Sequence, residues 1–151
     1  MGESNFEIRN ARSEDCESLA VLLNQLGYDQ ISKKNLKEIL EKVLKEKNMA
    51  ALVAVDKLSS QPIALMTYSY KVQLRVLGIL MEIDELVVDE KFRSHGVGAR
   101  LLEHSKKIAK EVGAKIIILS TNRDRPSYLR GFYTKHGFTE KNSALMMYKI
   151  P

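Results

Sequence analysis

Two closely spaced glycines, Gly96 and Gly98, form the part of this sequence that points most directly to chemistry. They follow an apolar stretch that ends at Val88 and stand where helical periodicity begins. The first turn of a helix presents backbone N–H groups that lack intrahelical partners, together with a partial positive charge, and glycine lets an anion approach them closely. Arg93 and His95 add side-chain donors. We therefore expect this loop to bind a phosphate group; the alternative is that the glycines only form a tight turn.

Two familiar phosphate-binding motifs do not fit the same loop. A dinucleotide fingerprint requires a third glycine at position 101, where this chain has Leu101. A Walker loop ends in Gly-Lys-Ser/Thr, whereas this sequence continues Gly98-Ala99-Arg100. The spacing thus argues against a nicotinamide, flavin or P-loop nucleotide site.

Carboxylates are concentrated on the strand that should lead into this loop, at Glu82, Asp84 and Glu85. Side chains alternate along a strand, so we expect Glu82 and Asp84 to share a face and Glu85 to point the other way. Acids in a central strand are costly to bury unless they have a partner or a task. The alternative is that the start of the strand is simply exposed.

The glycine loop and a later aromatic segment together resemble one family. Arg93-Ser94-His95-Gly96-Val97-Gly98 resembles the Gln/Arg-x-x-Gly-x-Gly/Ala motif of the GNAT superfamily of acetyl-CoA-dependent N-acetyltransferases. The segment from Phe132-Tyr133 to Gly137-Phe138 resembles that family's late Phe/Leu-Tyr-x-x-x-Gly-Phe signature. The resemblance covers the second half of the chain, and the first half agrees in its order of elements. Ser94 stands where many members have glycine, and serine is tolerated there if its φ stays negative.

The resemblance implies that acetyl-CoA binds with its pyrophosphate on the backbone of the loop. The stretch before the loop resembles the family's splayed strand, and a residue after the next strand often contacts the cofactor. The cofactor-binding residues implied in this way are Leu86, Val87, Val88, Arg93, Ser94, His95, Gly96, Val97, Gly98, Ala99 and Asn122. Asn122 is equally well suited to a turn.

Acetyl transfer from a thioester to an amine requires a neutral amine and a proton for the departing thiolate. The resemblance implies that Tyr133 is the general acid, since it occupies the family's usual position for that role. It also implies that an acid on the strand, Asp84 or Glu82, is the base. A water relay is an alternative to either carboxylate.

The periodicity of the sequence predicts the elements that position these residues. We predict an α/β fold in which residues 1–151 form a single GNAT-like domain, with a mixed central sheet and helices on both faces. The expected order is β-α-α-β-β-β-α-β-α-β. The predicted strands are 6–9, 49–55, 62–70, 77–88, 116–119, a short strand around 138 and 144–150; the predicted helices are 13–27, 32–44, 96–113 and 126–137.

Composition limits the class of protein and its partners. The chain has 151 residues, 44% hydrophobic and 28% charged, which is typical of one globular domain. It has a net charge of +5 and one cysteine, Cys16, on an apolar helix face. We therefore expect no disulfide and no metal, no nucleic-acid partner, no membrane association and a cytoplasmic location. Many relatives form dimers, so a homodimer remains open.

The leading hypothesis is an acyltransferase that moves an acetyl group from acetyl-CoA to the primary amine of a small molecule by direct attack. One alternative is an enzyme that acetylates a protein N-terminus or lysine. Another, of a different class, is a catalytically inactive module that keeps the CoA loop and acts as a sensor or partner subunit. Tyr133 and the acids of the strand argue against the inactive module.

Overall fold

A five-stranded sheet is the centre of the chain's first compact unit, which extends to Ser120; a second unit comprises Thr121–Pro151. The computed structural model describes residues 5–28 and 31–151. Along the sheet the strands lie in the order β1-β2-β3-β4-β5. Their bounds are Phe6–Asn10, Met49–Asp56, Pro62–Gln73, Gly78–Val88 and Ala114–Leu119. The first four strands pair antiparallel and β5 pairs parallel with β4, which confirms the predicted mixed sheet.

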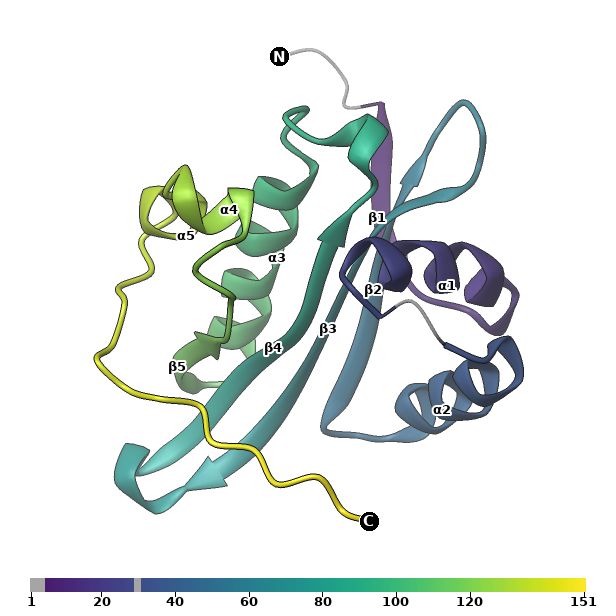
Figure 1. Cartoon of the computed structure of the whole chain (residues 1–151). Coiled ribbons are helices and arrows are strands. Elements are labelled where there is room, and N and C mark those ends of the chain that lie inside the picture. Colours follow the sequence, from purple (N-terminus) through teal and green to yellow (C-terminus); the bar gives the residue numbers. More distant parts are fainter. Residues whose placement is uncertain (1–4, 29–30) are drawn as a thin grey trace. The chain divides into compact units, whose positions relative to one another are not determined.

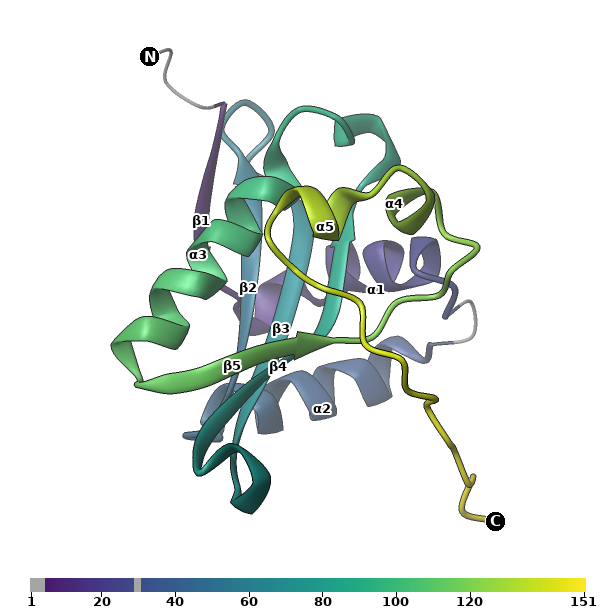
Figure 2. The ribbon, with the colours of Figure 1, turned by 90° about the vertical axis from the view of Figure 1, so that its left-hand side faces the viewer.

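Helices cover both faces of this sheet, as the sequence predicts. Helices α1 (Cys16–Gln25) and α2 (Lys33–Lys45) lie on one face, and α3 (Val97–Glu111) lies on the other (Figure 1, Figure 2). Short 3₁₀ turns occur at Ser13–Asp15, Leu74–Val76 and Glu90–Phe92. The core beneath α1 and α2 is a cluster of buried apolar side chains, most of them from these helices and the strands they cover. Its members are Ala11, Leu19, Leu22, Leu23, Leu40, Ala51, Val53, Val55, Leu65 and Val87.

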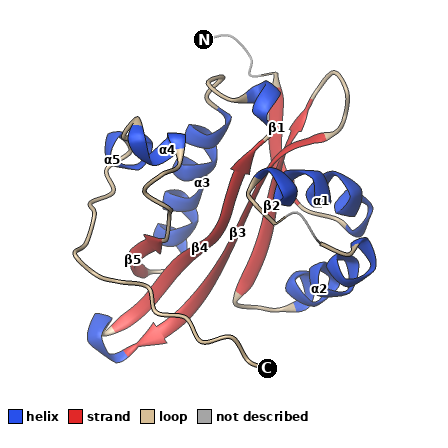
Figure 3. Cartoon of the chain, in the orientation of Figure 1, coloured by secondary structure: helices blue, strands red, loops and turns tan. Residues whose placement is uncertain are grey.

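The second unit contains two short helices, α4 (Pro126–Leu129) and α5 (Phe132–Lys135). We predicted one helix here, but Gly131 lies between the two with a left-handed backbone (φ = 66°), which interrupts the helix. The predicted strands around Phe138 and over 144–150 are wrong, since these residues are irregular (Figure 3). Leu145, for example, is 83% exposed. A strand requires a ladder partner, and β propensity alone does not supply one.

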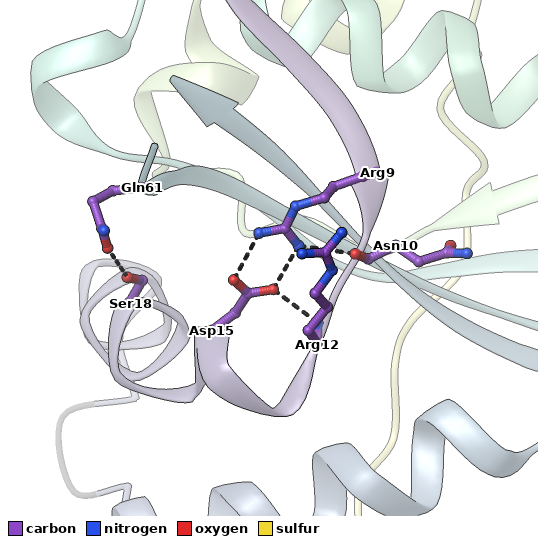
Figure 4. A network of polar contacts seen from close by, with 6 residues as sticks. All are labelled: Arg9, Asn10, Arg12, Asp15, Ser18 and Gln61. Atoms are coloured by element: carbon purple, nitrogen blue, oxygen red, sulfur yellow. Dashed lines mark hydrogen bonds and ion pairs between the residues drawn. The ribbon is translucent and has the colours of Figure 1, made fainter. Parts of the chain in front are cut away.

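A bidentate ion pair fixes the start of α1 to β1 (Figure 4). Arg9 donates from Nη1 to Asp15 Oδ2 at 2.8 Å and from Nη2 to Asp15 Oδ1 at 2.9 Å. The backbone N–H of Arg12 also donates to Asp15 Oδ2, at 2.8 Å. Burial raises the pKa of Asp15, but these hydrogen bonds outweigh that effect and hold the pKa below its ordinary value of 3.8. The folded chain therefore favours the ionised carboxylate.

We predict that Asp15→Asn lowers the free energy of unfolding at neutral pH by about 2 kcal/mol, because it removes a charged hydrogen-bond acceptor from a buried pair. The native pKa is depressed, so this stabilisation is present above the ordinary aspartate pKa and is lost as the pH falls. Urea unfolding at neutral pH and near pH 3 measures both effects. The variant should lose less stability on acidification than the wild type. Glu14→Gln, an equal charge change on an exposed neighbour, should change neither quantity by more than about 0.5 kcal/mol.

Candidate active site

One edge of strand β4 is paired along part of its length and unpaired along the rest. From Ile79 to Ile83 it pairs with β5, but β5 ends at Leu119, opposite Ile83. Beyond the unpaired Asp84, the stretch Glu85–Val88 continues to pair with β3, whereas no other strand of the described chain pairs with its second edge. Backbone groups along that edge have no strand partner and could pair with an extended ligand, except the carbonyl of Val88, which accepts a hydrogen bond from Arg93. Leu86, Val87 and Val88, the residues that resemble the family's splayed strand, lie on this stretch.

A β-bulge on the same stretch changes the direction of the acids. Ser69 of β3 pairs with Glu82 and Thr67 pairs with Glu85, so Asp84 is an additional residue on β4. Residues paired across strands share a face, and Ser69 and Thr67 are two apart on one strand. Glu82 and Glu85 therefore lie on the same face. Our expectation that Glu85 points the opposite way is wrong, because a single inserted residue reverses the alternation beyond it.

These acids belong to the face of the sheet that α1 and α2 cover. Leu65 and Val87 pair with each other and form part of the core beneath those helices. Thr67 and Glu85 are the next pair on that face, toward the centre of the two strands. The apolar core thus gives way to carboxylates along β4.

The electrostatics of the three acids differ. Partial desolvation raises the pKa of Asp84, and the charge of Glu82 adds to this effect, while Ser69 and Lys71 lower the pKa. Burial also raises the pKa of Glu85, as does the charge of Asp84. Glu82 forms an ion pair with Lys71. Two neighbouring carboxylates with raised pKa values are suited to attract a cation and accept a proton.

The loop between β4 and α3 presents the first turn of a long helix. Gly96 precedes the helix with a left-handed backbone (φ = 79°), and nothing lies within 4 Å of the position its Cβ would take. Ser94 also has positive φ, at 65°, so the condition under which serine would be tolerated there without strain is not met. Both residues are exposed. The backbone thus turns into α3 through two left-handed residues and leaves the helix N-terminus open to an anion.

Two side chains that we expected to bind phosphate are bonded to the loop itself. Arg93 donates from Nε to the carbonyl oxygen of Val88 at 3.0 Å. The Nδ1 atom of His95 lies 2.8 Å from the carbonyl oxygen of Arg93. Sequence reasoning missed a further residue, Gln25 of α1, which also contacts this loop. No local pattern identifies Gln25, since it is 65 residues from its partner in sequence.

Tyr133 and Asn122 belong to the second unit. Tyr133 lies on α5 and is half-buried, with its ring 5.2 Å from that of Phe132 and 6.3 Å from that of Phe138. Burial raises the pKa of Tyr133, and the hydroxyl of Ser127 acts in the opposite direction. The phenol therefore keeps its proton throughout the neutral range. Asn122 is exposed and accepts a hydrogen bond from the backbone N–H of Asp124 at 2.9 Å, which is the turn role we weighed for it.

Among residues 5–28 and 31–151, no three His, Cys, Asp or Glu side chains are grouped so that they could hold a metal ion. Within the same ranges, no helix has the length and apolar character needed to cross a membrane.

Comparison with known proteins identifies relatives over most of the chain. The profile of the acetyltransferase (GNAT) family matches residues 11–138. An aminoalkylphosphonate N-acetyltransferase of Salmonella typhimurium is 25% identical over 136 residues, which are 90% of this chain and 86% of that protein. A probable glucosamine 6-phosphate N-acetyltransferase of Oryza sativa is 35% identical over 75 residues, 50% of this chain and 43% of that protein. The crystal structure of a transcriptional regulator from Bacillus halodurans shares the fold, with a TM-score of 0.86, 24% identity and coverage of 95% and 99%.

The two left-handed residues predict opposite effects of substitution. Ser94→Gly should raise the free energy of unfolding by up to about 1 kcal/mol, because glycine adopts positive φ without a Cβ penalty. Gly96→Ala should lower it by about 1 kcal/mol, although the space for the methyl group is open. Urea unfolding of both variants measures the difference. Equal shifts of the same sign would contradict the backbone geometry of this loop.

Proposed function

Because the chain belongs to the acetyltransferase (GNAT) family and is an acyltransferase, we propose that it transfers an acetyl group from acetyl-CoA to the primary amine of a small molecule. We also propose that residues 1–151 form one catalytic domain. The family match from 11 to 138 supports this, since it continues past the boundary between the two units at Ser120.

One observation carries the proposal: an open strand edge leads directly into an open helix N-terminus. The pyrophosphate of the cofactor would accept hydrogen bonds from backbone N–H groups between Arg93 and Ala99. The amide groups of the pantetheine arm would pair with the free edge at Leu86, Val87 and Val88, as an added strand does. The thioester would then lie near the acids that precede Leu86 on β4. Asn122 remains a proposed cofactor contact from the second unit.

The proposed reaction is direct attack. An acid of β4, with Asp84 or Glu82 as the first candidates, takes the proton of the incoming ammonium, either directly or through water. The amine lone pair would then form a bond to the thioester carbonyl carbon, the nitrogen would release its second proton to water, and the C–S bond would break to give the amide. Tyr133 would donate its proton to the departing thiolate, which yields CoA, and the phenolate would regain a proton from water. The raised pKa of Tyr133 supports its role as a donor, since the phenol stays protonated until that step.

The acceptor is proposed to be a small amine rather than a protein. The two relatives above are named for an aminoalkylphosphonate and for glucosamine 6-phosphate, each of which carries an amine and a phosphorus-containing acid. The three carboxylates of β4 would attract the ammonium group. Lys71, which pairs with Glu82, is a cation on the same face that is suited to an anionic group of such an acceptor.

An acetylation screen with purified protein tests this function. The panel contains 2-aminoethylphosphonate, glucosamine 6-phosphate, a polyamine, and peptides with a free N-terminus or lysine, and release of CoA is followed. Turnover of a small amine with no turnover of the peptides supports the proposal. Preferred turnover of a peptide favours the protein acetyltransferase, and CoA binding without turnover of any acceptor favours the inactive module.

We predict that Tyr133→Phe lowers kcat by about 10²–10⁴-fold, the usual contribution of one general acid. The ring stays in place, so the melting temperature and the affinity for CoA should change little. Single-turnover kinetics, in which chemistry is observed directly, measure the effect. Tyr128→Phe, which removes a hydroxyl from the same unit, is the matched control. Wild-type single-turnover rates in Tyr133→Phe would exclude the role.

We predict that Glu82→Gln, Asp84→Asn and Glu85→Gln each lower kcat/KM near neutral pH, because all three acids belong to one cluster. The loss should shrink as the pH rises, since the acceptor then arrives already neutral and requires no base. pH–rate profiles with one good amine measure this. Glu103→Gln, an exposed change on α3, is the control and should leave the profile unchanged. Three silent variants would show that the base lies elsewhere.

A further inference from the structure

We propose that Gln25, the last residue of α1, is a positioning residue that holds the β4–α3 loop in its anion-binding conformation. This inference rests on the proposed function, since it concerns the loop to which we assign the pyrophosphate. Gln25 lies outside every motif of the sequence and outside the predicted site. Its side chain nevertheless connects α1 to three residues of the loop: Asp89, Glu90 and Arg93.

Both the oxygen and the nitrogen of the Gln25 side-chain amide form hydrogen bonds. Its Oε1 atom accepts from the backbone N–H of Glu90 at 2.9 Å and from Nη2 of Arg93 at 3.4 Å. Its Nε2 atom donates to Oδ2 of Asp89 at 3.5 Å. The other carboxylate oxygen of Asp89 accepts from the backbone N–H of Lys91 at 2.9 Å. The Gln25 side chain thus contacts the backbone of the loop at Glu90 and the charged side chains of Asp89 and Arg93.

The loop requires such support because its conformation is strained. Ser94 has positive φ at 65°, which costs a residue with a Cβ about 1–2 kcal/mol. The loop residues from Arg93 to Gly96 are exposed, so no apolar core holds them. The Arg93 side chain closes the turn onto the Val88 carbonyl, and Gln25 contacts the same guanidinium. Hydrogen bonds that hold N–H groups in place before an anion arrives lower the ordering cost of binding.

The chemistry of the contact favours glutamine at position 25 over glutamate, asparagine or alanine. A glutamate at position 25 would keep the acceptor for Glu90 but would place a second carboxylate against Asp89. An asparagine would be one methylene too short for the same contacts. Alanine would remove all of them, yet it would leave α1 intact, because alanine is the best helix former.

Variants at positions 25 and 24 test the inference. The assays are CoA affinity by calorimetry, the melting temperature, and turnover with acetyl-CoA and with S-acetylpantetheine, which lacks the pyrophosphate. Gln25→Ala should weaken CoA binding and raise the KM for acetyl-CoA about tenfold, the effect of one or two lost hydrogen bonds. The kcat, the melting temperature and kcat/KM for S-acetylpantetheine should stay near the wild-type values. Gln25→Glu should behave like Gln25→Ala. Asn24→Ala, on the exposed side of the same turn, is the control and should match the wild type.

The outcomes separate the two proposals. A wild-type chain that binds CoA, together with unchanged affinity in Gln25→Ala, overturns the positioning role and leaves the proposed function intact. An equal loss with both acyl donors, or a fall in melting temperature that accounts for the loss, also overturns it. A wild-type chain that binds no CoA overturns the proposed function and this inference with it.

Discussion

The free edge of β4 and the position of its acids both depend on the point at which the hydrogen-bonded ladder between β4 and β5 ends. Parallel pairing stops at Ile83 and Leu119, and β4 continues with β3 as its only strand partner in the described chain. The next residue of β4 is Asp84, the bulge. A strand that loses a neighbour on one edge and gains a residue against the other bends and twists more strongly. The free edge of β4 therefore begins within a few residues of Ile83. The acids are brought to one face there, and the chain then continues to α3.

The sequence was sufficient for most of the fold because its signals are local. Apolar residues at helical spacing identify α1, α2 and α3, and a continuous apolar run identifies β5. The loop at Gly96 could also be found from sequence, since glycine spacing before a helix is a local pattern with a physical reason. The predicted order of elements fails in the second unit, where Gly131 divides the predicted helix in two and the apolar residues of 144–150 have β propensity but no ladder partner in the described structure.

The features that the sequence could not supply depend on contacts between distant residues. The bulge at Asp84 is defined by the register of β4 against β3, and simple alternation therefore predicts the wrong face for Glu85. The positive φ of Ser94 is imposed by the turn, although serine itself disfavours it. Gln25 meets its loop partner across 65 residues of sequence. Each of these depends on three-dimensional neighbours, which propensity and periodicity do not encode.

Strand β4 and the loop that follows it carry opposite electrostatic character within a short length of chain. The acids at Glu82, Asp84 and Glu85 make the strand attractive to cations, whereas the N-terminus of α3 favours anions. A protein with a net charge of +5 would attract anions over much of its surface, so the carboxylates create a local exception. The reaction that we propose requires this separation, because its two substrates carry opposite charges at the groups that must be recognised. An anionic cofactor would be drawn to the helix and a protonated amine to the strand, and the open edge of β4 between them is the stretch along which the two would meet.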